Sequence, residues 1–101
     1  MKFGIEDKHW IELENLLLKP LRAKKVQIYV FGSRARGDFR KFSDLDLLLS
    51  FNEQNLLSDA ELFKMKEALA DSNLPIKVDI ALENELAESY RDQIFKERIL
   101  V

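Results

Sequence analysis

Apolar residues recur along this chain with two spacings, one typical of helices and one typical of strands. Residues 7–23 have apolar side chains at intervals of three and four, which predicts an amphipathic helix: Trp10, Leu13 and Leu17. Asp7 is the expected N-cap, and Pro20 is expected to end or bend the helix because proline lacks the donor of an interior turn. Trp10 is expected in the core, and His9, the only histidine, on the solvated surface.

Two apolar runs in the middle of the chain have the period of two that predicts strands. The first covers 26–31 and ends at Gly32, and the second covers 44–51. Successive side chains of a strand point to opposite faces, so the second run separates into two sets. One set is Asp44, Asp46, Leu48 and Ser50, and the other is Leu45, Leu47, Leu49 and Phe51. The apolar set is typical of a sheet that packs on helices, so we expect helices mainly on one face.

The second half of the chain predicts two more helices and one or two more strands. Ser58 and Glu61 have the spacing of a capping box that opens a helix, and this helix ends before Pro75. The run 75–81 predicts a third strand, and the helix before it is long enough for a crossover connection. Asn84 is a possible N-cap for the last helix.

The last helix would place three side chains on one face: Leu86, Tyr90 and Ile94. At this spacing we expect Tyr90 in the core, although it could also stack on a base. The apolar end 99–101 could add a short final strand. The pattern as a whole predicts a single domain over 1–101 of the α/β (α+β) class, with a small mixed sheet of three to four strands.

The amino-acid composition limits the kinds of molecule that this protein is expected to bind. Hydrophobic residues make up 47% of the chain and charged residues 34%, with a net charge of -2. Proteins that grip long nucleic acids are usually basic, so extended nucleic-acid binding is disfavoured. The chain has no cysteine, which excludes disulfides and thiolate sites. It has no signal-peptide pattern and no run of about 18 apolar residues, so we expect a cytoplasmic protein that does not enter the membrane.

Asp44 and Asp46 are the first candidate for chemistry. On one face of a strand their Cα atoms lie roughly 7 Å apart, so both carboxylates can lean onto one divalent ion or two. Without a cation the like charges would raise one pKa. Oxygen ligands suit Mg²⁺ or Mn²⁺. An isolated Asp-x-Asp is also common by chance, with one residue ending a turn and the other facing water.

Gly32 and Ser33 are the second candidate, because they follow a strand directly. Glycine lets the backbone approach a ligand closely, and exposed N–H groups at such a turn bind anions. Arg34 and Arg36 would add positive charge for a polyphosphate. An ordinary turn with solvated arginines is the alternative.

Asp79 is the third candidate, on the opposite face of its strand from the apolar residues around it. An aspartate in an otherwise apolar strand is costly to desolvate without a partner. A metal shared with Asp44 and Asp46 would be such a partner, and an ion pair with Lys77 is the alternative. The intervening loop 38–43 is expected to be solvated or to touch a ligand, with Ser43 placed to orient Asp44.

The string GSRARG, five residues and SDLDL, with a later acidic residue at Asp79, resembles the minimal nucleotidyltransferase branch of the DNA polymerase beta superfamily. The resemblance implies the polymerase beta palm-like fold and a two-metal nucleotidyl transfer with Mg²⁺, or Mn²⁺, as cofactor. Asp44 and Asp46 would bind both ions, and Asp79 would complete the site for the ion that activates the acceptor. Gly32, Ser33, Arg36 and Arg34 would bind the phosphates of a nucleotide, with ATP favoured.

In this family, minimal nucleotidyltransferases are commonly paired with small helical HEPN-type proteins, as antitoxin to toxin. The resemblance therefore implies AMP transfer to a hydroxyl of such a partner, and a second copy of the chain could also complete the site. Larger members continue into a second domain that this chain does not show. Two other readings remain open: a small-molecule nucleotidyltransferase, such as one that modifies an antibiotic, and an antitoxin that acts by contact alone.

Overall fold

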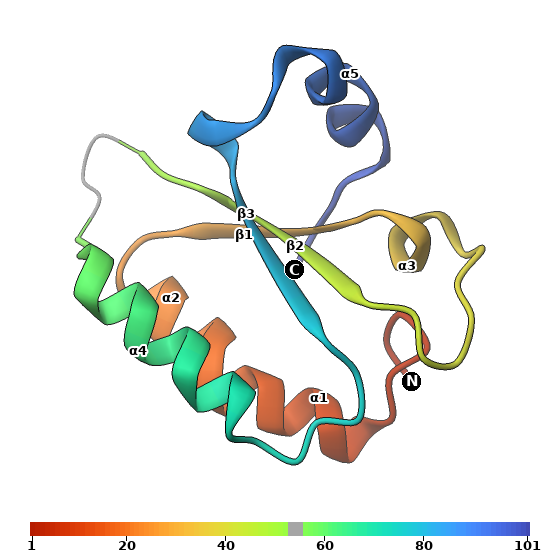
Figure 1. Cartoon of the computed structure of the whole chain (residues 1–101), viewed down its shortest axis with the longest axis vertical. Helices are drawn as coiled ribbons and strands as arrows, with labels where there is room; N and C mark the ends of the chain where they lie inside the picture. The colour runs from red at the N-terminus through yellow and green to blue at the C-terminus, as the bar shows by residue number, and fades with distance from the viewer. Residues whose placement is uncertain (53–55) are drawn as a thin grey trace.

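The computed structural model describes residues 1–52 and 56–101, which form a mixed sheet in the order β3-β2-β1-β4 with helices on both faces (Figure 1). The elements in chain order are α1 (Asp7–Leu13), the π-helical turn η1 (Glu14–Leu18), α2 (Lys19–Ala23), β1 (Gln27–Phe31), α3 (Ser33–Arg36), β2 (Leu45–Ser50), α4 (Asp59–Ala70), β3 (Val78–Leu82), the 3-10 turn η2 (Glu83–Glu85), α5 (Glu88–Glu97) and β4 (Ile99–Leu100). β1 pairs antiparallel with β2 and β4, and β2 is parallel to β3. The predicted mixed α+β fold is confirmed.

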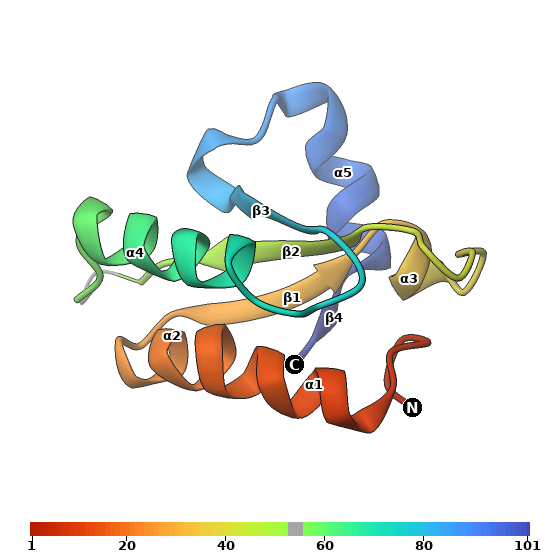
Figure 2. The same cartoon turned by 60° about the horizontal axis from the view of Figure 1, so that its bottom comes forward.

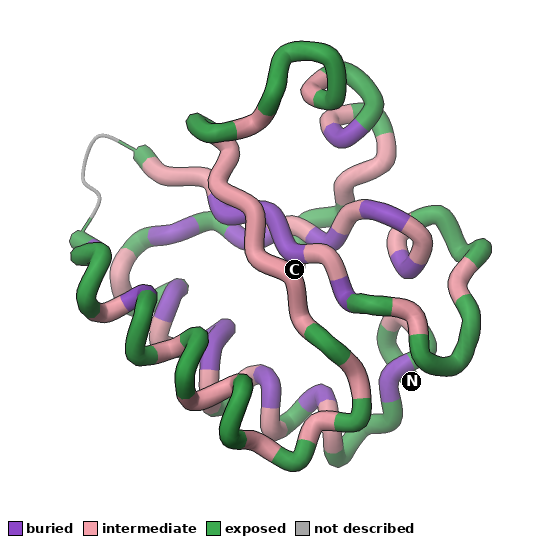
Figure 3. The backbone as a smooth tube through the Cα atoms, in the orientation of Figure 1, coloured by how far each residue is buried: buried purple, intermediate pink, exposed green. Residues whose placement is uncertain are grey.

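One face of the sheet holds the core. α1, η1 and α2 form one continuous helix below the sheet in Figure 2, whereas α5 lies above it. Fully buried leucines from the long helix and from β2 meet there: Leu13, Leu17, Leu18, Leu21, Leu45, Leu47 and Leu49. Figure 3 shows the same asymmetry, because buried positions follow the central strands and the long helix while α5 is mostly exposed. Each such leucine contributes about 1.5–3 kcal/mol of burial, so this face supplies most of the stability.

The first helix passes through Pro20 instead of ending there. The chain widens into the π-helical turn η1 just before the proline, and the α-helix resumes from Lys19 to Ala23. A π turn accommodates the missing N–H of Pro20, which lies in the first turn of α2. The prediction of Asp7 as N-cap was wrong by one residue: Glu6 is the N-cap, and its carbonyl accepts the N–H of Trp10 at 2.9 Å.

The last helix differs more from its prediction. Asn84 lies in η2 and caps nothing, because α5 begins only at Glu88, after Ala87. Tyr90 is 66% exposed, so its predicted place in the core was wrong. Ile94 is the buried residue of α5. No helix in the described ranges has the length and apolar character needed to cross a bilayer.

The capping box predicted for α4 is present. Ser58 Oγ accepts the N–H of Glu61 at 3.1 Å, and Glu61 Oε1 accepts the N–H of Ser58 at 3.2 Å. We expect Ser58→Ala to lower the free energy of unfolding by about 1 kcal/mol, because it leaves a helix N–H without its partner. Urea denaturation measures this change. Ser89→Ala, at an exposed position in α5 without a cap bond, is the control, and an equal loss in both variants would contradict the capping role.

Candidate active site

The predicted acidic residues meet at one end of the sheet. The pairing register sets Asp46 of β2 between Asp79 of β3 and Phe31, the last residue of β1. Gly32 follows Phe31 directly, and Asp44 lies one residue before β2. Residues paired across neighbouring strands share a face, so Asp46 and Asp79 lie on the same face, opposite the core, as the alternation predicted. β3 itself begins at Val78, later than the predicted run.

Asp46 has unfavourable electrostatic surroundings. Burial raises the pKa of the Asp46 carboxyl, and the negative charges of Asp79 and Asp44 raise it further. Arg36 acts in the opposite direction but does not reverse the shift. The fold therefore holds this carboxylate where a cation would relieve the repulsion.

The donor chemistry of the three carboxylates fits a hard divalent cation, although their side chains do not converge on one point. Within 1–52 and 56–101, no three acidic or imidazole side chains form a group that could hold an ion. Asp79 Oδ1 lies 3.2 Å from Lys77 Nζ, the ion pair that the sequence offered as the alternative. The side chain of Lys77 is 71% exposed, so turning Asp79 toward Asp46 would break only a solvent-screened pair.

Gly32 forms the turn between β1 and α3, and no other residue fits there. Its φ of 75° and ψ of -157° lie in a region that essentially only glycine adopts. A Cβ on this residue would lie 2.3 Å from Asp46 Oδ2. Ser33 then begins the short helix α3, with its side chain half-buried. The turn thus brings the backbone of β1 directly against the carboxylate of β2.

Arg34 serves the loop and not the acidic cluster. Its side chain is buried, and its guanidinium donates to three backbone carbonyls, those of Phe3 at 2.7 Å, Ser43 at 3.0 Å and Lys41 at 3.1 Å. It also lies 4.9 Å from the ring centroid of Phe39. Arg34 was expected to bind phosphate, but its guanidinium donors are already used to hold the N-terminal segment and the loop together. We therefore do not include Arg34 in the candidate site.

The loop 38–43 is otherwise mostly exposed, with Phe42 at 69%. The structure gives Ser43 a partner within the loop, because Ser43 Oγ accepts the backbone N–H of Arg40 at 2.8 Å. Ser43 thus closes a turn within the loop.

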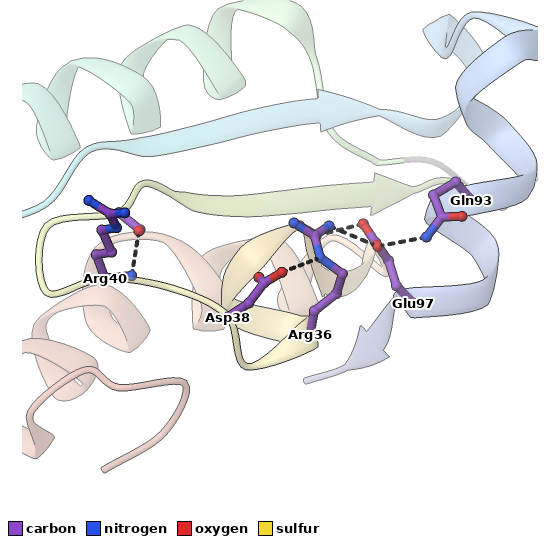
Figure 4. Close-up of polar contacts among 7 residues, drawn as sticks. Arg36, Asp38, Arg40, Gln93 and Glu97 are labelled. Atoms are coloured by element: carbon purple, nitrogen blue, oxygen red, sulfur yellow. Dashed lines mark hydrogen bonds and ion pairs between the residues drawn. The ribbon is translucent and has the colours of Figure 1, made fainter.

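Arg36 faces the site and is held by two acidic side chains (Figure 4). Its Nη1 donates to Glu97 Oε2 at 3.0 Å, and its Nε donates to Asp38 Oδ2 at 3.2 Å. Glu97 Oε1 also accepts the N–H of Gly32 at 2.9 Å, while Gln93 Nε2 donates to Glu97 Oε2 at 3.2 Å. The carboxylate at the end of α5 therefore joins the glycine turn to Arg36.

Sequence reasoning missed Glu97. It lies 65 residues from Gly32, in a helix with several other charged residues, and no local motif marks it. One weak signal exists: a carboxylate in the last turn of a helix interacts unfavourably with the helix dipole. Such a residue therefore indicates a stabilising partner elsewhere in the fold. Burial by itself raises the pKa of Glu97, but the hydrogen bonds from Arg36, Gly32 and Gln93 outweigh it, and the net shift of the pKa is downward.

A groove of about 610 Å³ opens beside Asp79, between the end of α4 and the outer edge of β3. Its lining includes Lys66 and Lys77 along with apolar side chains such as Leu69 and Ile76. No strand of the described chain pairs with this edge of β3. The groove therefore gives solvent and ligands access to Asp79 from the side away from Gly32.

The family model described as polymerase beta, nucleotidyltransferase matches residues 17–101. The chain is 34% identical over 96 residues to the protein adenylyltransferase MntA of Thermococcus cleftensis, covering 89% of this chain and 93% of that protein. It is also 34% identical over 74 residues to a protein of Haemophilus influenzae described as a probable protein adenylyltransferase, MntA, covering 73% of this chain but only 63% of the relative's length.

Two solved structures share the fold. A protein described as a minimal nucleotidyltransferase superposes with a TM-score of 0.66 at 33% identity, covering 100% of this chain and 97% of the other. A toxin-antitoxin complex with AMP-PNP gives a TM-score of 0.62 at 26% identity, covering 86% of this chain and 70% of the other. The chain belongs to the polymerase beta nucleotidyltransferase family and is a nucleotidyltransferase of the minimal type.

Gly32→Ala should reduce nucleotidyl transfer about 100-fold, the scale expected when reacting groups are misplaced by roughly an ångström. The added Cβ collides with the Asp46 carboxylate. Gly37→Ala is the matched control: its φ of 90° is also positive, but nothing lies within 4 Å of the added carbon. That variant should lose about 1–2 kcal/mol of stability and keep its activity. Equal activity in the two variants would show that the close approach is unimportant.

Asp46→Asn should change the pH dependence of stability in metal-free buffer. A carboxyl whose pKa is higher in the folded state binds its proton more tightly there, so it adds stability below its ordinary pKa and loses that contribution as pH rises through the raised value. The wild type should therefore lose stability relative to Asp46→Asn as the pH rises above about 4, the ordinary pKa of an aspartate. Thermal melts in a chelator at several pH values measure the difference, and a difference independent of pH would refute the electrostatic account.

Proposed function

We propose that this chain transfers AMP from ATP to a hydroxyl group of a partner protein in a toxin-antitoxin pair, with Mg²⁺ as cofactor and Mn²⁺ as a substitute. The observation that carries the proposal is the register that sets Asp46 beside Asp79 with the Gly32 turn against it. The relatives described as protein adenylyltransferases support ATP and a protein acceptor, and the complex with AMP-PNP supports a partner. A small helical protein of the HEPN type is the proposed partner, which makes this chain the antitoxin.

The reaction joins the acceptor oxygen to the α-phosphorus of ATP and breaks the bond between that phosphorus and the oxygen leading to the β-phosphate. The acceptor hydroxyl loses its proton, and pyrophosphate leaves. Asp44, Asp46 and Asp79 would hold the divalent cations, which when bound supply charge stabilisation to the phosphates and lower the pKa of the acceptor hydroxyl. The chain's other residues position the two reactants.

The phosphates of ATP would bind at the β1–α3 turn. The backbone N–H groups and hydroxyl at Ser33 lie at this turn, and Arg36 adds a guanidinium whose side chain is 43% exposed. Anions bind well to such a combination of turn N–H groups and arginine. The acceptor would approach from the other side, where the groove beside β3 reaches Asp79. Asp46, between the two, would face the transferred phosphorus.

Incubation with α-³²P-labelled ATP and Mg²⁺, with and without the protein encoded by the adjacent gene, tests the proposal. We expect label on the partner, and Asp79→Asn should reduce it roughly 100-fold or more, the usual scale for losing one charge-positioning group. Asp92→Asn, at an exposed position in α5, is the control and should label normally.

Absence of label with all four nucleotides, and with Mn²⁺ in place of Mg²⁺, would refute the proposal. The double variant Asp44→Asn, Asp46→Asn then distinguishes transfer from contact. An enzyme that neutralises its partner by modification should lose neutralisation in this variant, whereas an antitoxin that acts by contact should retain it.

A further inference from the structure

The carboxylate of Glu97 links three parts of the site from a distant element. Oε1 accepts the N–H of Gly32 at 2.9 Å, and Oε2 accepts from Arg36 Nη1 at 3.0 Å and from Gln93 Nε2 at 3.2 Å (Figure 4). The side chain of Glu97 is only 9% exposed, whereas that of Arg36 is 43% exposed. The carboxylate therefore lies behind the guanidinium, and the guanidinium faces solvent.

The Gly32 backbone and the Arg36 side chain, the two groups that Glu97 binds, would both be mobile without a partner. Gly32 has the widest conformational choice of any residue, yet its backbone must stay in one unusual conformation against the Asp46 carboxylate. Arg36 ends a helix of only four residues, which is too short to fix a long side chain by itself. One carboxylate that accepts hydrogen bonds from both reduces the freedom of both, and Gln93, one helical turn earlier, keeps that carboxylate in place.

We infer that Glu97 is a positioning residue for nucleotide binding, which sets the Gly32 turn and aims the Arg36 guanidinium at the phosphates without touching the substrate itself. This inference rests on the proposed function. Within the described residues, the Nη2 group of Arg36 makes no hydrogen bond, so it is available to a phosphate while Nη1 and Nε are held by Glu97 and Asp38. The C-terminal helix α5 is thereby a part of the phosphate site.

Glu97→Gln is the test variant. In either orientation of the amide, one of the two donors, the Gly32 N–H or the Arg36 guanidinium, meets an NH₂ group in place of an oxygen. We expect the KM for ATP to rise about tenfold, the scale of one charge-assisted hydrogen bond, while kcat changes much less. Glu88→Gln is the control, because Glu88 lies exposed at the other end of the same helix and should leave both constants unchanged.

A double-mutant cycle with Arg36→Ala separates positioning from a general loss of structure. Because Glu97 acts through both Arg36 and Gly32, Glu97→Gln should raise the KM for ATP less in the Arg36→Ala background than in the wild type, and the remaining rise reports the loss of the Gly32 contact. Fully additive effects would overturn the inference, as would an unchanged KM. A lower KM would also overturn it, because that outcome would mean that the Glu97 carboxylate competes with the phosphates for Gly32 and Arg36.

Direct binding of a fluorescent ATP analogue, with and without Mg²⁺, keeps this inference distinct from the proposed function. A wild type that binds ATP but labels no partner would refute the proposed transfer and leave the Glu97 effect measurable as a change in affinity. A wild type that transfers label, with Glu97→Gln binding ATP equally well, would refute the inference alone. A wild type that binds no nucleotide would refute both.

Discussion

The close approach between the end of β1 and the carboxylate of Asp46 is the constraint on which the site depends. Gly32 leaves no room for a side chain, and its backbone conformation is open essentially to glycine alone. This contact places the backbone of the Gly32 turn beside the Asp46 carboxylate, although the two come from different strands. In the proposed reaction the phosphates of the nucleotide and the cations would need that same proximity, so Gly32 would link the phosphate site to the metal site.

The arrangement places like charges close together, and the packing of the rest of the fold outweighs the repulsion between them. The half-buried carboxyl of Asp46 lies near two like charges, whereas the opposite face of the same strand is lined by fully buried leucines. Burial of the leucine face stabilises the fold, and the repulsion between carboxylates on the acidic face offsets part of that stabilisation. A cation bound beside Asp46, as in the proposed function, would remove this repulsion as well as making its own contacts.

The two arginines of the motif show how geometry divides similar residues. Arg34 and Arg36 lie two positions apart in a short helix and therefore point to different sides. Arg34 turns inward and donates to backbone carbonyls, which fixes the loop. Arg36 turns toward the acidic cluster, where Glu97 from the last helix holds it. From the sequence alone, both arginines would be assigned to the phosphate site. In the structure, Arg34 has a structural role and Arg36 belongs to the candidate site.

The sequence by itself determined the long helix, the alternating strands, the capping box of α4 and the candidate acidic residues, because these depend on periods and motifs within a few neighbouring residues. It could not decide that β2 and β3 run parallel, that Tyr90 is exposed, or that Asp79 pairs with Lys77. For Glu97 it gave only the weak signal of a carboxylate in the last turn of a helix. Those features depend on contacts between segments far apart in the chain, where tertiary packing and not local propensity fixes which groups meet.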